Sequence, residues 1–233
     1  MNEYSVELGG MKNKFFTRNY FIKKDSNYKK NVIDFIIDRK NTDIYKSIYE
    51  YSDLDFESCK LYAPFYIDLD MDMIDNESRY NKLKKDLLIV YAYLTNILKI
   101  PKESIGIYFS GHKGYHIIIP PEVIGIKPCT NLNILYKKVA LEIKNNTLYD
   151  TVDTKIYDNR RLLRITNSIH SRTNLHKVPI SIDAVRTMNY SNLQEYASSP
   201  KLNKKISSKY NVEACVEFKK IIEKKRIFGR GEV

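Results

Sequence analysis

The stretch APFYIDLDMD, residues 63–72, constrains the fold of this chain more than any other segment. Apolar and polar side chains alternate along it: Phe65, Ile67, Leu69 and Met71 against Tyr66, Asp68, Asp70 and Asp72. A period of two is typical of a β-strand with one apolar face and one polar face. Asp68 and Asp70 would share the polar face, roughly 6–7 Å apart at the backbone.

Two carboxylates held this close repel each other unless a cation lies between them. Mg²⁺ and Mn²⁺ prefer oxygen ligands of this kind. Carboxylates are also common on solvent-facing strands, so this segment alone leaves both interpretations open, a metal site and an ordinary polar surface.

The composition is that of a folded, soluble chain that can bury a core. Its 233 residues are 43% hydrophobic and 29% charged, which fits one large domain with or without a small appendage. No apolar run approaches the roughly 20 residues of a membrane span, and the N-terminus does not resemble a secretion signal, so we expect no membrane partner. Cysteines 59, 129 and 215 form no CxxC pair, so we expect no zinc and a reducing, cytoplasmic setting.

The positive charge is concentrated late in the chain. Of the formal net charge of +11, +9 lies beyond residue 152, where 17 basic and 8 acidic side chains occur. A concentrated positive field favours a polyanion, most often nucleic acid. A solvated lysine-rich tail is the alternative for the last 33 residues.

Hydrophobic periodicity, caps and breakers predict the other elements. The expected helices cover residues 42–51, 76–100, 130–144, 191–197 and 212–225, the expected strands cover 105–109, 115–119 and 178–182, and a polar linker covers 200–208.

Two further segments have a composition that suits phosphate binding. The hairpin sequence YFSGHKGYHIIIP, residues 108–120, offers glycine N–H groups together with Ser110, His112, Lys113 and His116. Residues 152–181 place Asp153 upstream of a dense set of donors: Arg160, Arg161, Arg164, Ser168, His170, Arg172, His176 and Lys177. An ordinary hairpin with an incidental lysine is the alternative for the first segment.

Taken together, YIDLDMD, SGHKGYH and the Asp153 segment with RLLRITNSIHSRT resemble the three motifs of the archaeo-eukaryotic primase superfamily, which includes primase-polymerases (PrimPol-like enzymes). The motifs lie within residues 60–182 in the family's order. Arg172 stands where many members have lysine, Lys113 where many have arginine, and Asn174 where glycine is frequent. Residues 1–58 and 185–233 match no motif of the family.

The resemblance implies roles for individual residues. Asp68, Asp70 and Asp153 match the catalytic carboxylates that hold two Mg²⁺ or Mn²⁺ ions. The expected nucleotide-binding residues are Ser110, His112, Lys113, His116, Arg164, Ser168, His170 and Arg172. Arg160, Arg161 and Lys177 are expected to contact the template.

The resemblance also implies an α/β fold in which a mixed sheet, an RRM-like palm, packs against a smaller N-terminal α/β unit. We expect the catalytic core to span residues 1–200 and a basic helical extension to span residues 201–233.

The function expected from the resemblance is template-dependent nucleotidyl transfer by a DNA primase or primase-polymerase. It would make or extend short strands from NTPs or dNTPs on single-stranded DNA. A helicase or further replication domains are the partners expected in a bacterial, archaeal, viral or mobile-element setting. Three alternatives stay open: a polymerase that only extends primers, a non-catalytic nucleic-acid-binding replication factor with the same fold, and a metal-dependent nuclease.

Overall fold

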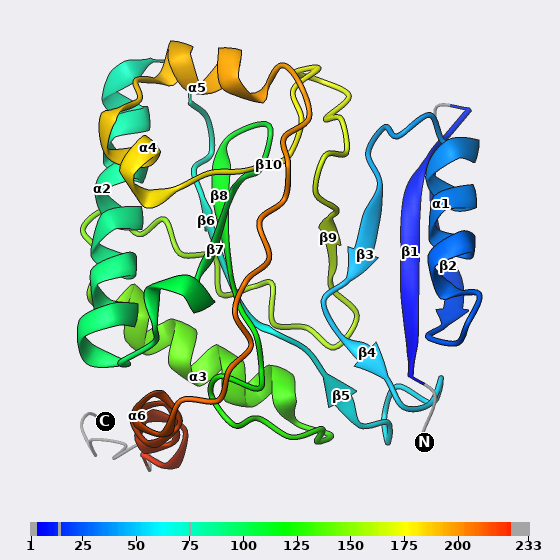
Figure 1. Ribbon diagram of the computed structural model, residues 1–233, viewed down its shortest axis with the longest axis horizontal. Helices are drawn as coiled ribbons and strands as arrows, with labels where there is room; N and C mark the ends of the chain where they lie inside the picture. The colour runs from blue at the N-terminus through cyan, green and yellow to red at the C-terminus, as the bar shows by residue number, and fades with distance from the viewer. Residues whose placement is uncertain (1–3, 14, 75, 225–233) are drawn as a thin grey trace, which may run out of the picture.

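The computed structural model describes residues 4–13, 15–74 and 76–224, and two sheets form its frame (Figure 1). The N-terminal sheet has the order β5-β4-β1-β3-β9, with β2 paired to β1, and the central sheet has the order β10-β7-β8-β6. The strands of the N-terminal sheet are β1 (Ser5–Lys12), β2 (Phe15–Lys23), β3 (Tyr45–Ser47), β4 (Glu50–Tyr51), β5 (Leu61–Tyr62) and β9 (Leu162–Arg164). Those of the central sheet are β6 (Phe65–Asp70), β7 (Gly106–Phe109), β8 (Gly114–Ile119) and β10 (Val178–Pro179).

Strand β6 is the acidic strand expected from the alternating sequence. Ile67 and Leu69 are fully buried against the helices, whereas Asp68 and Asp70 lie on the opposite face and are partly exposed. Asp68 is directly opposite His116 on β8, which is in turn opposite Tyr108 on β7. Side chains paired in this way share one face of a sheet.

The α/β fold class is confirmed, but the ladders between named strands are antiparallel where we expected a mixed sheet. Strands β6 and β7 run in the same direction because helix α2 (Glu77–Ala92) carries the chain back between them. The β7–β8 hairpin then inserts β8 between the two parallel-running strands, so each neighbouring pair becomes antiparallel. The description of this sheet as RRM-like stays a prediction.

Helices cover the apolar face of the central sheet. Asn76 and Ser78 were both possible caps from the sequence, and the structure shows that Asn76 caps α2 by accepting a hydrogen bond from the Arg79 N–H at 2.9 Å. A π-helical turn (Tyr93–Ile97) and a 3₁₀ turn (Lys102–Ser104) lead from α2 into β7. The remaining helices on this side are α3 (Leu132–Lys144), α4 (Ile182–Thr187), α5 (Tyr190–Ala197) and α6 (Val212–Glu223).

The smaller N-terminal unit has its own apolar cluster. Helix α1 (Tyr28–Asp38) packs Phe35 against Val6, Leu8 and Ile22 of strands β1 and β2. The expected helix over residues 42–51 was wrong, since this segment forms β3 and β4 instead. Its isoleucines and tyrosines favour extended structure, and pairing with β1, β5 and β9 provides the partners that a short strand needs.

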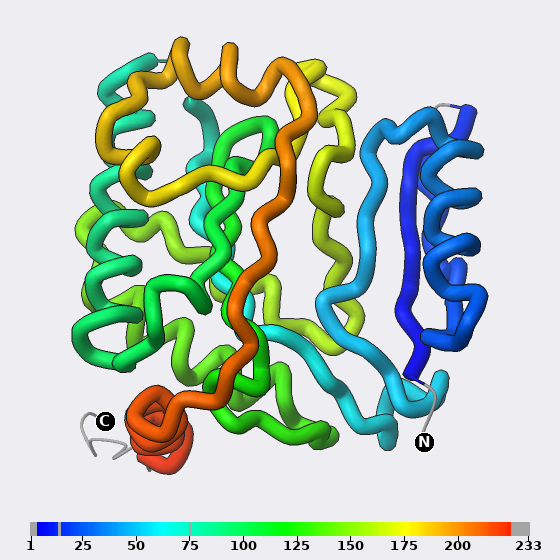
Figure 2. Tube along the Cα trace, in the orientation of Figure 1, coloured from blue at the N-terminus to red at the C-terminus, as the bar shows by residue number. Residues whose placement is uncertain are grey.

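The C-terminal segment contributes to the main core. Residues 201–211 contain no helix or strand and cross in front of the central sheet before α6 begins (Figure 2). Phe218 of α6 is fully buried, with its ring centroid 5.1 Å from Phe65 and 6.2 Å from Tyr136. The domain boundary at residue 200 stays a prediction, and residues 225–233 of the expected extension lie outside the described residues.

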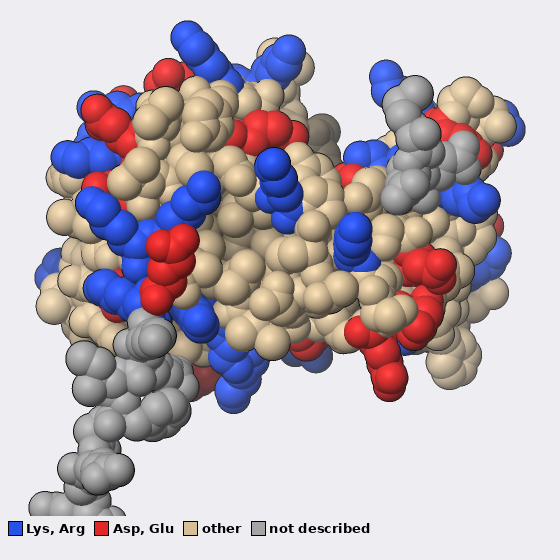
Figure 3. Space-filling model, turned by 90° about the horizontal axis from the view of Figure 1, so that it is seen from below, with Lys and Arg blue, Asp and Glu red and all other residues tan. Residues whose placement is uncertain are grey.

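In the part of the chain that the structure describes, no helix is long and apolar enough to cross a bilayer. Lys and Arg side chains are interspersed with Asp and Glu on the face that contains α6 (Figure 3). On this face, positive charge therefore does not form one continuous patch over the residues drawn in colour.

We expect Phe218→Ala to lower the free energy of unfolding by about 3 to 5 kcal/mol, because it leaves a cavity beneath Phe65 and Tyr136. Val216→Ala on the same helix should cost less than about 0.5 kcal/mol, since Val216 is exposed. Denaturant unfolding of the two variants measures the difference. Equal losses would show that α6 does not stabilise the core.

Candidate functional site

Three aspartates meet at one edge of the central sheet. Asp68 and Asp70 project from the same face of β6. Residues 151–153 run beside β6: the Asp70 N–H donates to the Thr151 carbonyl at 2.8 Å, and the Asp153 N–H donates to the Asp68 carbonyl at 2.9 Å. The structure therefore brings Asp153 next to the two carboxylates on β6, although it is more than 80 residues away in the sequence.

The electrostatics of Asp68 are set by its surroundings. Burial raises the pKa of Asp68 to about 7, and the neighbouring charges of Asp70 and Asp153 add to this, whereas Lys177 and Arg161 act in the opposite direction. Burial also raises the pKa of Asp70. Lys113 acts in the opposite direction and lowers this pKa, since its Nζ lies 3.1 Å from Asp70 Oδ2. Like charge and desolvation thus both oppose ionisation of Asp68.

Lys177 is the buried counter-charge beneath the site. Burial lowers the pKa of Lys177 to about 7, although the charge of Asp68 opposes the shift. Its Nζ donates to the Arg164 carbonyl at 2.7 Å and lies 5.7 Å and 5.4 Å from the ring centroids of Tyr66 and Tyr108. Lys177 was expected to contact template, but only 2% of the residue is exposed, so its charge acts on Asp68 from within.

His116 is the site residue with an unsatisfied nitrogen. Its Nε2 lies 3.5 Å from Asp68 Oδ1, while its buried Nδ1 has no hydrogen-bond partner among the described residues. Burial, together with Lys177 and Arg164, holds the pKa of His116 well below its usual value, so the imidazole is neutral. A buried polar atom without a partner points to a water or a ligand at this position.

The glycine hairpin has the tight geometry that its sequence predicted. Gly111 has φ +83°, a conformation that favours glycine, and a Cβ on Gly114 would overlap the Leu69 carbonyl of β6. Ser110 Oγ accepts hydrogen bonds from the Gly114 N–H at 3.1 Å and the His112 N–H at 3.3 Å. The hairpin is tied to the third motif by Thr173, whose hydroxyl donates to the Gly111 carbonyl at 2.6 Å.

Some residues of the third motif (the Asp153 segment with RLLRITNSIHSRT) line the cleft, and others make structural contacts away from it. His170 lies in the cleft with its ring centroid 4.5 Å from that of His112, and burial with nearby Arg164 lowers its pKa to about 4. Arg164 forms an ion pair with Asp43 and donates to the Tyr45 hydroxyl at 2.6 Å. Ser168 is fully buried, and its hydroxyl accepts from the Ile44 N–H at 2.8 Å. Ser168 therefore holds the segment after β9 against the segment before β3, and both strands belong to the N-terminal sheet.

Asp68, Asp70, the hairpin and β9 form a cleft of about 200 Å³, and Asp153 does not line it. Its walls are formed by Tyr45, Asp68, Asp70, Ser110, His112, Lys113, His116, Arg161, Leu162, Leu163, Arg164 and His170. The expected nucleotide-binding residues Ser168 and Arg172 do not line it. Tyr45 was missed, because its segment was expected to be helical and pairing with β1 and β9 brings it to the cleft.

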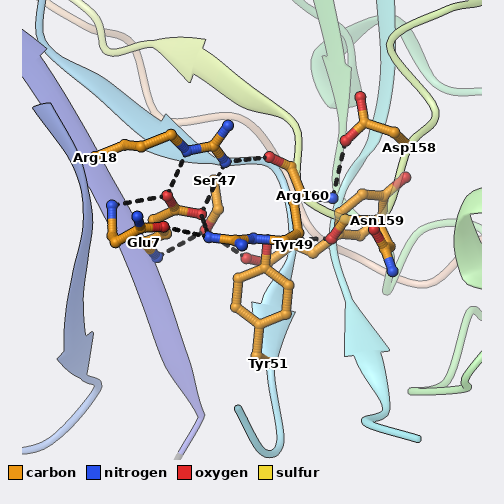
Figure 4. A network of polar contacts seen from close by, with 9 residues as sticks. Glu7, Arg18, Ser47, Tyr49, Tyr51, Asp158, Asn159 and Arg160 are labelled. Atoms are coloured by element: carbon orange, nitrogen blue, oxygen red, sulfur yellow. Dashed lines mark hydrogen bonds and ion pairs between the residues drawn. The ribbon is translucent and has the colours of Figure 1, made fainter. Parts of the chain in front are cut away.

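Arg160 and Arg161 lie at different places despite being adjacent. Arg161 lines the cleft, with its Nη2 3.7 Å from Asp153 Oδ2. Arg160 belongs to a polar network around the buried Glu7, which Arg18 also contacts (Figure 4). The Arg160 guanidinium lies 3.3 Å from Glu7 Oε2 and 4.5 Å from the centroid of Phe56. The Arg160 guanidinium is therefore held by contacts within the protein, whereas the sequence led us to expect a contact with template.

Among the described residues, no three side chains of the His, Cys, Asp and Glu types are already arranged as a metal cluster. Asp70 is turned toward Lys113, and Asp153 accepts a hydrogen bond from the Lys155 N–H at 2.7 Å. The donor chemistry of the three carboxylates still fits a hard divalent cation, which would relieve the repulsion and desolvation felt by Asp68.

The fold is similar to that of the polymerase domain of ligase D from Mycobacterium tuberculosis, solved in complex with DNA. The TM-score is 0.53 and the sequence identity is 13%, over 84% of this chain and 81% of that chain. At this identity the likeness is one of fold, and at that level it confirms the resemblance that the motifs indicated. No protein-family model and no curated protein sequence matches the chain.

Asp68 should destabilise the cation-free protein above neutral pH. Its folded-state pKa of about 7 lies above the ordinary 3.8, so between these values the folded state binds more protons than the unfolded state and stability falls as pH rises. Asp68→Asn removes the charge and should raise the free energy of unfolding at about pH 8 by up to about 4 kcal/mol, since each pKa unit corresponds to about 1.4 kcal/mol.

Denaturant unfolding with a chelator at about pH 5 and about pH 8 measures this effect. At the lower pH the gain should fall to about 2 kcal/mol, because the folded wild-type carboxyl is then protonated and only the unfolded carboxyl is ionised. Asp72→Asn, which alters an exposed carboxylate beyond the end of β6, is the matched control. A gain from Asp68→Asn that is equal at both pH values would contradict the role of the Asp68 charge.

Proposed function

We propose that this chain catalyses template-dependent nucleotidyl transfer on DNA as a primase-polymerase. The observation that carries the proposal is the position of Asp68, which is largely buried beside two further aspartates and lines a cleft whose other walls supply histidine, lysine and arginine. The fold shared with a polymerase domain solved with DNA supports the same class of reaction.

Asp68, Asp70 and Asp153 would hold Mg²⁺ or Mn²⁺ in the proposed reaction. Such ions, when bound, favour attack by a 3′-hydroxyl on the α-phosphate of a nucleotide and stabilise the pyrophosphate that leaves. The burial of Asp68 excludes water from one side of these carboxylates, which strengthens their interaction with positive charge. Lys177 limits the negative charge beneath them when no ion is present.

The opposite wall suits the triphosphate of the incoming nucleotide. Lys113, His112 and His170 come from the hairpin and the third motif, and Arg161 from the segment that leads into β9, so donors converge from separate parts of the chain. The unpartnered Nδ1 of neutral His116 offers one more polar contact. A nuclease has no β- and γ-phosphates to bind, so this donor set favours polymerisation.

Asp68→Ala combined with Asp70→Ala should abolish nucleotide incorporation on both primed and unprimed single-stranded templates, because the variant lacks the cation-binding carboxylates of β6. Incubation with labelled NTPs or dNTPs and Mg²⁺ or Mn²⁺ measures this directly. Asp72→Ala should retain activity, since this exposed residue does not line the cleft.

Each outcome of this assay identifies a function. Product from an unprimed template supports primase activity, whereas product only from a primed template identifies an extending polymerase. No product from the wild type with either substrate favours a non-catalytic binding factor. Incorporation retained by the double variant would refute the assignment of the site.

His116→Asn should chiefly weaken nucleotide binding, because it removes a polar contact to the phosphates while keeping a polar side chain at the buried position. We expect the KM for nucleotide to rise by about 10-fold, equivalent to about 1.4 kcal/mol, with kcat changed by less than about 3-fold. Steady-state kinetics separate the two constants. A fall in kcat with an unchanged KM would place His116 in the chemical step instead.

A further inference from the structure

A cavity larger than the cleft lies away from the aspartates, beneath residues 201–211, which we call the strap. It has a volume of about 620 Å³ and is formed by the strap, the start of β7, the segment after β10 and parts of α2, α4 and α5. Strand β10 has only two residues, and the chain then turns into α4. The edge of β7 near Gly106 is therefore left open for a pocket.

The strap is held firmly over this pocket. The Tyr108 hydroxyl donates to Asn203 Oδ1 at 3.1 Å, and the Ser207 N–H donates to the Glu103 carbonyl at 2.9 Å. Gly106 provides the space for Ile206, since a Cβ at this position would overlap the isoleucine side chain. The pocket is thus formed by the fold before any ligand enters.

Tyr108 links the pocket to the catalytic cleft. Asp68, His116 and Tyr108 lie opposite one another on three neighbouring strands of one sheet face, and Tyr108 also lines the pocket. Strands are spaced by roughly 4.8 Å, so Tyr108 lies roughly 10 Å from Asp68 across the sheet. One bound strand of nucleic acid can therefore reach both places.

The lining of the pocket has the chemistry of a nucleotide-binding site. Its inner walls are largely apolar and include three tyrosines, Tyr91, Tyr108 and Tyr196. Three lysines, Lys102, Lys204 and Lys205, line it together with one acidic side chain, Glu103. Apolar and aromatic walls with a positive rim suit a base and sugar joined to a phosphate.

We propose that this pocket binds a nucleotide of the same single-stranded nucleic acid that occupies the cleft, with Lys204 and Lys205 on its phosphates. The proposal rests on the proposed nucleotidyl transfer and assigns the strap a place in strand binding. An extended peptide is the less suitable occupant, because the edge strand β10 contains Pro179, which has no N–H to offer to an added strand.

Strand affinity of the full-length chain tests the pocket. Lys204→Gln with Lys205→Gln removes two exposed charges at the pocket, and Lys209→Gln with Lys219→Gln removes two exposed charges outside it. For a labelled oligothymidylate of about 12 nucleotides, the pocket variant should bind about 10-fold more weakly than the wild type and the control about 2-fold or less. Fluorescence anisotropy without divalent cations measures both.

The salt dependence of strand affinity gives a second measurement at the same two lysines. For a single strand, each phosphate that a lysine neutralises adds about 0.7 to the steepness of log K against log salt, so the slope of the pocket variant should be shallower by about 1.4. Ala184→Phe narrows the pocket without changing charge and should also weaken binding. Equal weakening in the two lysine variants, or wild-type affinity in Ala184→Phe, would overturn the proposal.

The experiments can refute the proposal for the pocket and the proposal for catalysis independently of each other. Asp68-dependent incorporation together with equal strand binding by the lysine variants would refute the pocket alone. Pocket-dependent strand binding by a wild type that incorporates no nucleotide would refute the catalytic proposal alone. Truncation after residue 200 is not a suitable test, since it removes Phe218 from the core.

Discussion

The repulsion among three aspartates is the interaction on which the account of this site depends. Backbone pairing forces them together: β6 holds Asp68 and Asp70 on one face, and the hydrogen bonds of residues 151–153 to β6 fix Asp153 beside them. Burial of Asp68 then makes its ionised form unfavourable. The simplest explanation for a carboxylate in such an unfavourable position is that a bound cation supplies a compensating positive charge.

Some residues of the third motif that first resemble ligand contacts have a structural role beside the site instead. Arg164 on β9 pairs with Asp43 and Tyr45, and Ser168 accepts the Ile44 N–H. These contacts hold β9 against β3 within the N-terminal sheet, so that Tyr45 reaches the cleft. The central sheet is joined to this segment by Thr173, which donates to the Gly111 carbonyl, and by Lys177, which donates to the Arg164 carbonyl. The third motif consequently serves both as a joint between the sheets and as a wall of the cleft.

The sequence predicts those parts of the fold whose signals are local. Alternation located β6, and paired glycines located the β7–β8 hairpin. The start of α2 was located to within two residues, since Asn76 and Ser78 were both possible caps. Tertiary pairing decided the rest: β3 and β4 are too short to be recognised without their partners. The buried Glu7 gives no local signal either, because one of its counter-charges, Arg160, is contributed from 153 residues away.

Direct measurement of cation binding tests the central claim, that the three aspartates act together. Titration of Mn²⁺ by calorimetry should show binding to the wild type and markedly weaker binding to Asp153→Asn, whose carboxylate comes from outside β6. Arg161 and Lys155, which now contact Asp153, would remain in place. Equal Mn²⁺ affinity in the two proteins would contradict the claim.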